Sequence, residues 1–362
     1  MRIVIAAGGT GGHVYPALSL ADAIKSENNN SEILFIGTED HLEATEIPAA
    51  GYLFKTIKAS GLSGSVFAKM HSAYQIMKAV DKAKTLLIDF KPDVVIGFGG
   101  YVSAPVIIAA HRLKIPVVLH EQNAYAGRAN LYLEKYAAAI VVCYEEARHQ
   151  FKQKEVYLLG NPRMFTVKKT EDTNILKEYR LLKSKPVVMF VMGSQGSRSV
   201  NEIMLKTLKL LRNKPYQVLY VTGKEHYEAF RQAIPEDENI RIIPYVKQTE
   251  MLRHTDLLVT RGGATTATEI CAFSVPSIII PSPYVPNNHQ EVNAQALVIK
   301  KAAFMLREKE LDDNNVVDLI DKIMDDKKLR QTMRENSKTL CFPNAAENIV
   351  DLLKKVGKPF DQ

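Results

Sequence analysis

The sequence has few cysteines, and none of them lies in a pattern that binds a metal. Its 362 residues include three cysteines, Cys143, Cys271 and Cys341, which are too far apart for a C-x-x-C site. Three cysteines are also too few for a disulfide framework, and this small number is typical of a reducing compartment. The sequence therefore excludes a disulfide-bonded miniprotein.

Long hydrophobic runs are also missing. The apolar run at residues 3–7 is too short for a signal-peptide core, and glycines follow it at once. No stretch approaches the roughly 18 uninterrupted apolar residues that a membrane-spanning helix needs. We expect a protein that lies in the cytoplasm and contacts a membrane, if at all, only at its surface.

Charge of one sign is not in strong excess. Lys and Arg number 47 against 40 Asp and Glu, a net charge of +7, which is too small for a dedicated nucleic-acid binder. Hydrophobic residues make up 46% and charged residues 24%, which is ordinary globular usage. At roughly 150 residues per domain, the length predicts two domains, with three as the alternative.

Short apolar runs alternate with longer amphipathic stretches along the chain. This alternation predicts a parallel sheet with helices on both faces, because strands buried on both faces are continuously apolar. The first set of predicted strands spans residues 2–7, 32–36, 93–97, 117–120 and 139–142, with helices at 14–26, 42–50, 66–90 and 102–113. A second set of predicted strands spans residues 187–192, 218–221, 240–243, 257–260 and 277–280.

Sequence motifs in the second set of strands resemble those in the first. Residues 8–13 read GGTGGH and 193–198 read GSQGSR, each after a strand, while 93–100 read DVVIGFGG and 256–263 read DLLVTRGG. We therefore predict two Rossmann-like, doubly wound parallel-sheet domains that face a cleft, with a boundary within 160–173. The tail, 312–357, is predicted to be helical with a break at 341–343.

Glycine-rich loops follow several predicted strands, at the sheet edge where open parallel sheets bind ligands. Glycine lets the backbone approach a ligand closely, and the helix that follows offers N–H groups to a phosphate or a developing anion. The loops match neither the dinucleotide fingerprint nor the G-x-x-x-x-G-K-[ST] loop. Glu269 lies about one turn into its helix, where it either accepts both hydroxyls of a ribose or complements the helix dipole.

Taken in order, the motifs resemble those of the MurG family of bacterial peptidoglycan glycosyltransferases. The resemblance covers essentially the whole chain and rests on GGTGGH, GFGGYVSAP, HEQN, GNPR, GSQGS, RGGATTATE and His289-Gln290 with Asn293-Ala294. It implies a GT-B fold and transfer of N-acetylglucosamine from UDP-N-acetylglucosamine to the 4-hydroxyl of the muramoyl sugar in lipid I, giving lipid II. It also implies inversion at the anomeric carbon, with no metal and no cofactor.

The resemblance implies a role for each domain. Residues 1–163 would form the acceptor and membrane-side domain and 164–341 the UDP-sugar domain, while a helix in 342–362 would pack back toward the first domain. The enzyme would be peripheral on the cytoplasmic face of the cell membrane, where other cell-wall synthesis proteins are possible partners.

The family's site residues carry over by motif. Ser194 would meet the diphosphate, Val246 the uracil through its backbone, Glu269 the ribose and Gln290 the sugar hydroxyls. The remaining implied donor contacts are Thr10, Gly11, Gly12, Asn123, Arg163, Arg261, Ala264 and Thr265. The implied acceptor contacts are Tyr101, His120 and Asn130.

The reaction needs a base for the acceptor hydroxyl. His13 is our first candidate, because it stands at the mouth of the first glycine loop and an imidazole titrates near working pH. The alternative is that His13 only caps a helix or orients phosphate. Glu121 and His120 are further candidates, and they in turn could instead shape the loop that holds the acceptor.

The predicted helix at 66–90 carries apolar residues at helical spacing with lysines beside them. Such a helix either lies on anionic lipid or packs a core-facing stripe with a solvated basic edge. Its apolar residues are Val66, Phe67, Met70, Tyr74, Ile76, Met77 and Val80, and its basic residues are Lys69, Lys78, Lys82 and Lys84.

Three other functions fit a similar two-domain chain. A UDP-N-acetylglucosamine epimerase would need acid and base groups but no lipid acceptor, and a diacylglycerol-directed transferase would be a nearer relative in fold. A non-catalytic nucleotide-sugar sensor would have no use for the HEQN side of the site.

Overall fold

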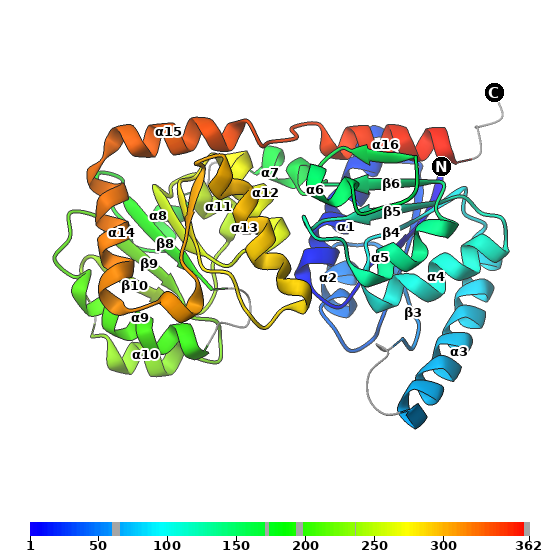
Figure 1. Ribbon diagram of the computed structural model, residues 1–362, viewed down its shortest axis with the longest axis horizontal. Helices are drawn as coiled ribbons and strands as arrows, with labels where there is room; N and C mark the ends of the chain where they lie inside the picture. Colours follow the sequence, from blue (N-terminus) through cyan, green and yellow to red (C-terminus); the bar gives the residue numbers. More distant parts are fainter. Residues whose placement is uncertain (60–65, 171–173, 193–197, 236, 358–362) are drawn as a thin grey trace. The chain divides into compact units, whose positions relative to one another are not determined.

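The computed structural model describes residues 1–59, 66–170, 174–192, 198–235 and 237–357, with the side chains of 66–73 and 198–199 excluded. The chain divides into two compact units (Figure 1). Unit 1 comprises Met1–Thr166 and Phe342–Gln362, and unit 2 comprises Val167–Cys341. The chain therefore leaves unit 1 after residue 166 and returns to it at residue 342.

Unit 1 is built on a seven-stranded sheet in which all neighbouring strands pair in parallel, in the order β3-β2-β1-β4-β5-β6-β7. Its central strands are almost entirely buried and mostly apolar, as two-sided coverage by helices requires. The strands are β1 (Arg2–Ala6), β2 (Glu32–Gly37), β3 (Leu53–Thr56), β4 (Val94–Gly97), β5 (Val117–Glu121), β6 (Ala139–Val142) and β7 (Val156–Leu158).

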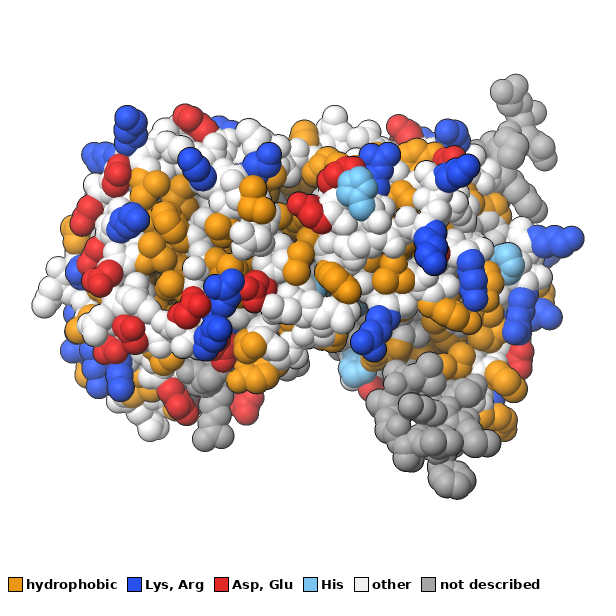
Figure 2. Space-filling model, in the orientation of Figure 1, with side chains coloured by type: hydrophobic (Ala, Val, Ile, Leu, Met, Phe, Trp, Pro, Cys, Tyr) orange, Lys and Arg blue, Asp and Glu red, His pale blue; other side chains and the backbone are white. Residues whose placement is uncertain are grey.

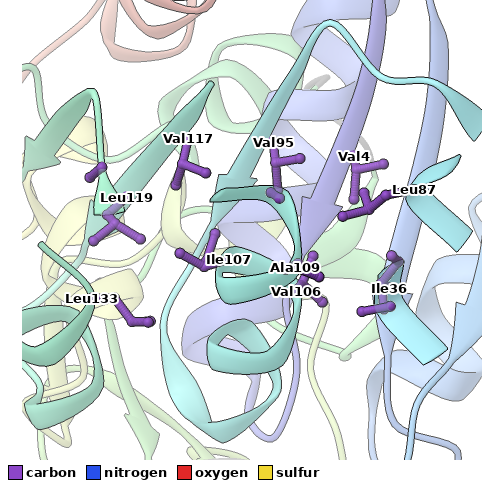
Figure 3. Packing of buried hydrophobic residues seen from close by; sticks show 14 of the residues in the cluster. Val4, Ile36, Leu87, Val95, Val106, Ile107, Ala109, Val117, Leu119 and Leu133 are labelled. Carbon is purple, nitrogen blue, oxygen red and sulfur yellow. The ribbon is translucent and has the colours of Figure 1, made fainter. Parts of the chain in front are cut away.

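Helices cover both faces of this sheet. On one face, Val4 of β1 and Val95 of β4 point toward Val106 of α4, and Leu87 of α3 lies beside Val4 (Figure 3). On the other face, α1 and the C-terminal α16 pack together over the strands. The helices are α1 (Gly11–Glu27), α2 (Glu43–Ala49), α3 (Val66–Phe90), α4 (Gly100–Arg112), α5 (Arg128–Leu133), α6 (Glu145–Arg148), α7 (Met164–Lys169, in which the chain passes to unit 2) and α16 (Ala345–Val356).

Unit 2 repeats this plan with six parallel strands in the order β10-β9-β8-β11-β12-β13. The strands are β8 (Val187–Val191), β9 (Gln217–Val221), β10 (Ile240–Ile243), β11 (Leu257–Thr260), β12 (Ser277–Ile279) and β13 (Ala303–Met305). The helices are α8 (Ile175–Glu178), α9 (Arg198–Leu210), α10 (Tyr227–Ala233), α11 (Gln248–Leu252), α12 (Ala264–Phe273), α13 (His289–Ile299), α14 (Asp313–Asp325) and α15 (Lys327–Lys338).

The aspartate that opens each repeated motif does the same structural work in both units. Asp93 accepts the backbone N–H of Arg2 at 2.7 Å, and its own N–H donates to the Arg2 carbonyl at 2.8 Å. Asp256 accepts the N–H of Val187 at 3.0 Å and donates to the Val187 carbonyl at 2.8 Å. The motif that is repeated in the two halves therefore includes an aspartate whose side chain fixes where β1 and β8 begin.

The structure confirms the predicted doubly wound sheets and all ten predicted strands to within one or two residues. The sequence did not indicate β3, β7 and β13, which lie at sheet edges. These strands have only three or four residues and are partly exposed, so even the apolar runs of β7 and β13 are too short to mark a strand. The helical tail breaks at 339–344, as predicted, and also at Asp326, between α14 and α15.

The apolar stripe predicted on α3 is wrong in one respect. Val80 is 3% exposed and belongs to the core, whereas Tyr74 and Met77 are 51% and 61% exposed. These residues therefore lie on different faces of the helix, and the side chains of residues 66–70 lie outside those described. Among the residues that the structure describes, no helix is long and apolar enough to cross a membrane.

Gly160 stands where unit 1 receives the returning chain, and we expect an alanine there to be costly. Its φ is +84°, and a Cβ atom would lie 2.4 Å from Cβ of Phe342. Gly51 is a matched control, because its φ is +82° but a Cβ atom would meet nothing within 4 Å. Gly51→Ala should cost about 1–2 kcal/mol from backbone strain alone. Gly160→Ala should lower the thermal unfolding midpoint markedly further, and equal midpoints would contradict the close packing.

Candidate functional site

In unit 1 the loops after β1, β4 and β5 lie side by side, because these three strands are neighbours in a parallel sheet. The connection from β1 passes to β2 on one side, whereas β4 lies on the other side. The sheet therefore has its topological switch point between β1 and β4, and ligands of doubly wound folds bind at such a point. The two glycine loops predicted from sequence, 8–13 and 97–101, flank it.

His13 lies at this switch point. Its Nδ1 is 3.0 Å from the carbonyl oxygen of Gly8 and 3.4 Å from Oγ1 of Thr10. A carbonyl only accepts, so Nδ1 carries the hydrogen and the neutral ring has its lone pair on Nε2. The ring lies against the second glycine loop, since a Cβ on Gly99 would be 3.7 Å from Nε2 and one on Gly100 would be 3.6 Å from Nδ1. The imidazole is thus held in the tautomer that can take a proton at Nε2.

Three helices that start at strand ends present N-termini without side-chain caps. Within the described residues, neither α1, which begins at Gly11 and Gly12, nor α4 nor α12 has a side-chain cap or an acidic residue in its first turn. By contrast, Asp312 and Asp326 cap α14 and α15 and accept backbone N–H groups there. The uncapped ends combine N–H groups with partial positive charge, and they are suited to an anionic ligand.

Glu121 of the HEQN motif is buried and accepts four hydrogen bonds. Its Oε1 accepts from the backbone and side-chain nitrogens of Asn123 at 3.0 and 3.1 Å. Its Oε2 accepts from the backbone of Gly127 at 2.9 Å and from Nδ2 of Asn130 at 2.8 Å. These bonds use both carboxylate oxygens, so the geometry favours a role in ordering the loop after β5 over proton transfer.

His120 is completely buried. Its ring stacks on Phe98 with 4.8 Å between ring centres, and Nε2 lies 3.3 Å from the carbonyl oxygen of Gly160 and 3.8 Å from Sγ of Cys143. Burial lowers the pKa of His120 from 6.5 to about 4. The imidazole is therefore neutral and weakly basic at neutral pH, which disfavours it as the catalytic base.

The other sequence-predicted residues of unit 1 surround this point. Tyr101 stands in the first turn of α4, and its ring lies 3.7 Å from where a Cβ on Gly9 would be. Arg163 lies 5.3 Å from the ring centre of Tyr15 in α1, and its backbone N–H donates to Oδ1 of Asn161 at 2.9 Å. Thr10 lies beside His13, and Asn123 and Asn130 donate to Glu121. Oδ1 of Asn130 is buried and has no hydrogen-bond partner among the described residues.

In unit 2, the loop after β8 contains Ser194 and lies outside the described residues. Arg261, which follows β11, forms a buried ion pair with Glu308 at 2.9 Å and donates to the carbonyl oxygen of Ile280 at 3.0 Å. These contacts connect the loops after β11, β12 and β13. The guanidinium is thus engaged with protein groups, which favours a role in holding the loops over the predicted substrate contact.

The predicted ribose ligand Glu269 is buried in α12, and its Oε2 accepts a hydrogen bond from Nε2 of Gln248 at 2.6 Å. Gln248 begins α11, two residues after the buried Val246. One side chain therefore connects the predicted uracil and ribose contacts. The sequence analysis did not identify Gln248, because it lies 21 residues from its partner and in no glycine motif.

The remaining predicted donor contacts gather at the loop after β11. Ala264 begins α12, and Oγ1 of Thr265 is buried without a hydrogen-bond partner in the described part of the chain. Gln290, in α13, accepts the backbone N–H of Ser282 at 2.9 Å through Oε1. Asn293 donates to the carbonyl of Gly262 at 3.1 Å and so ties α13 to the RGG segment.

Two doubly wound units with glycine loops and uncapped helices at the strand ends are typical of the GT-B fold, and the family models identify the chain as a two-domain glycosyltransferase of this type. The sequence matches the glycosyltransferase family 28 N-terminal domain over residues 3–142 and the family 28 C-terminal domain over residues 187–349.

Individual proteins narrow this class. The UDP-N-acetylglucosamine–N-acetylmuramyl-(pentapeptide) pyrophosphoryl-undecaprenol N-acetylglucosamine transferase of Limosilactobacillus fermentum is 39% identical over 361 residues, covering 98% of each chain. The crystal structure of Acinetobacter baumannii MurG is 26% identical, with a TM-score of 0.78 over 98% of this chain and 99% of that one. The chain belongs to the MurG family of these N-acetylglucosamine transferases.

The fold alone does not separate this family from epimerases. A UDP-GlcNAc 2-epimerase from Neisseria meningitidis, solved bound to UDP-GlcNAc, has a TM-score of 0.71 over 98% of this chain and 100% of that one. It is only 13% identical, so the similarity extends to the fold and no further.

The burial of His120 leads to a prediction about acid. Because its folded pKa of about 4 lies below the ordinary 6.5, the unfolded chain binds more protons between these values. The stability that this group contributes should be lost as pH falls from 6.5 toward 4. NMR titration should show a neutral His120 ring at pH 5, with His120→Gln identifying the resonance and reducing the acid sensitivity of unfolding. A ring that titrates near 6.5 would contradict the buried environment.

Proposed function

We propose that this chain transfers N-acetylglucosamine from UDP-N-acetylglucosamine to the 4-hydroxyl of the muramoyl sugar in undecaprenyl-pyrophosphoryl-MurNAc-pentapeptide. Unit 1 holds the acceptor and unit 2 the donor. The reaction is one in-line displacement that inverts the anomeric carbon, and it uses neither a metal nor a cofactor. The observation that carries the proposal is the 39% identity, over 98% of each chain, to a transferase of this name.

His13 is the proposed general base. The hydrogen bond between Nδ1 and the Gly8 carbonyl leaves the lone pair of the neutral ring on Nε2. As the acceptor oxygen attacks the anomeric carbon, Nε2 takes the hydroxyl proton, and the Gly8 carbonyl stabilises the imidazolium through the same hydrogen bond. A positioned base of this kind accelerates a reaction about 10²–10⁴-fold.

The leaving diphosphate is stabilised by fixed dipoles. The uncapped start of α12, at Ala264 and Thr265, provides N–H groups and partial positive charge. Ser194 and Arg163 add hydrogen-bond donors by analogy with the family motifs. Preorganised donors of this kind neutralise developing charge without a divalent ion.

The nucleoside is recognised in unit 2. The two oxygens of Glu269 accept the ribose hydroxyls, the backbone of Val246 binds uracil, and Gln290 reads the sugar hydroxyls. The Gln248 amide orients the carboxylate of Glu269. Arg261 keeps the loops in place through Glu308 rather than by touching the donor.

The acceptor is recognised in unit 1. We assign Tyr101 and Asn130 to contact with the acceptor sugar, and we keep Asn123 as a donor contact. Glu121 holds both asparagines by three of its four hydrogen bonds. His120 supports the loop from beneath as a neutral, buried ring. Glu121 and His120 are therefore no longer candidate bases in this proposal, because both are buried and both are engaged in hydrogen bonds within the protein.

A transfer assay tests the reaction and its base together. With EDTA present, label from UDP-N-acetylglucosamine should appear on a lipid I analogue. His13→Ala should lower kcat at least about 100-fold while the Kd for UDP-N-acetylglucosamine stays nearly unchanged. His149→Ala is a control, because that ring is exposed and remote in the sequence from the glycine loops. Release of epimerised sugar nucleotide without acceptor would contradict the function, and an active His13→Ala would move the base elsewhere.

The outer face of α3 is the proposed membrane contact. Tyr74, Met77 and Ile88 are at least half exposed, and Nζ of Lys78 lies 4.6 Å from the ring centre of Tyr74. Figure 2 shows basic and hydrophobic side chains beside one another on this face of unit 1. Amphipathic residues of this kind sit at lipid headgroups, and each lysine adds about 1 kcal/mol on an anionic surface.

A charge-reversing pair should weaken this contact. The double variant Met77→Asp, Lys78→Glu should bind vesicles containing phosphatidylglycerol at least about tenfold more weakly at low salt, because it removes both apolar and basic contact. Lys209→Glu with Leu210→Asp makes the same change on the surface of α9 in unit 2. Vesicle flotation should separate the two variants, and equal binding would remove α3 from the proposal.

A further inference from the structure

Glu43 is a fully buried carboxylate that the proposed reaction does not use. It is the first residue of α2 and is 0% exposed. Its Oε2 accepts the backbone N–H of Gly9 at 3.0 Å. Its Oε1 accepts the backbone N–H of Thr38 at 3.2 Å and the Thr38 hydroxyl at 2.6 Å. The carboxylate therefore connects the end of β2 to the first glycine loop, 34 residues away.

The glycine loop is fitted closely around this side chain. A Cβ atom on Gly8 would lie 2.3 Å from Oε1 of Glu43, and one on Gly37 would lie 2.8 Å from its Cγ. Burial raises the pKa of Glu43, whereas the hydrogen bonds from Thr38 and Gly9 lower it. The hydrogen bonds outweigh burial, so the pKa lies below its ordinary value. The side chain is thus an anion that three donors hold in place.

Two residues of the proposed site depend on the backbone that Glu43 holds. The carbonyl of Gly8, adjacent to the anchored Gly9, accepts Nδ1–H of His13 at 3.0 Å. Tyr101 of the second glycine loop lies over Gly9, with its ring 3.7 Å from where a Cβ on Gly9 would be. The same carboxylate consequently sets the position of groups from both glycine loops.

We propose that Glu43 is a positioning residue for the transfer reaction, fixing the first glycine loop through Gly9 and Thr38 so that His13 and Tyr101 meet the acceptor correctly. The inference rests on the proposed function, in which His13 takes the acceptor proton. A carboxylate suits this role because its two oxygens accept all three donors and it presents no hydrogen of its own. A neutral amide would turn an N–H₂ group toward one of those donors.

The test separates positioning from stability. Glu43→Gln should lower kcat about 10- to 100-fold, the effect of a misplaced catalytic group, with the KM for UDP-N-acetylglucosamine nearly unchanged. Asp93→Asn is the matched control, since Asp93 accepts the backbone N–H of Arg2 at the opposite edge of the same sheet. Both variants should melt at similar temperatures while only Glu43→Gln loses kcat. Equal kcat values in the two variants, or a loss confined to the donor KM, would overturn the proposal.

Conservative variants and a double mutant identify the route. Thr38→Ser keeps the hydroxyl and should remain active, whereas Thr38→Val should lose kcat as Glu43→Gln does; equal losses would overturn the role of this hydrogen bond. If Glu43 acts largely through His13, Glu43→Gln should lower kcat far less in the His13→Ala background than in the wild type. An undiminished loss there would refute that route. A wild-type kcat in His13→Ala would refute the proposed base instead, so the two failures are distinguishable.

Discussion

All strands of each sheet run in one direction, and this constraint decides where chemistry is possible. Because all strands are parallel, their carboxyl ends lie at the same edge of the sheet. The loops that follow the strands, and the N-termini of the helices after those loops, therefore lie together at that edge. In unit 1 the edge carries the loops after β1, β4 and β5, and in unit 2 those after β8, β11 and β12. Each unit thereby has the backbone N–H groups of several helix starts at one edge.

Buried acids keep these loops in place. Glu121 orders the loop after β5 and Glu43 the loop after β1, while Arg261 and Glu308 connect three loops of unit 2. Each acid accepts backbone or side-chain hydrogens within the protein and leaves the helix ends above it uncapped. This division suits the diphosphate binding that we propose, since an acid at those helix ends would repel the ligand.

Sequence reasoning succeeded where a residue's environment is local. Interior strands are recognisable because both faces are buried and the run is continuously apolar, and the glycine loops follow directly from them. Edge strands β3, β7 and β13 pair on one side only, have three or four residues each and are partly exposed, so their runs are too short to be recognised. The motif order was specific enough to indicate the family without any of these strands.

The roles of individual site residues were harder to predict, because they depend on partners distant in sequence. The letters HEQN do not reveal that Glu121 accepts four hydrogen bonds or that His120 is buried against Phe98. Gln248 and Glu43 lie outside the glycine motifs, and their partners are 21 and 34 residues away. A glutamate five residues after a strand-end threonine was the available signal for Glu43, and by itself it suggests only a helix-dipole partner.

The return of the chain to unit 1 at residue 342 affects the order in which the protein can fold during synthesis. Unit 2 is continuous from Val167 to Cys341, so its core is complete once that stretch has left the ribosome. Unit 1 emerges first, but the face of α1 that packs against α16 stays uncovered until Ala345–Val356 has been made. Domains generally fold as units on emergence. The nascent chain therefore carries an open apolar surface on its first domain for the time needed to translate the whole of its second.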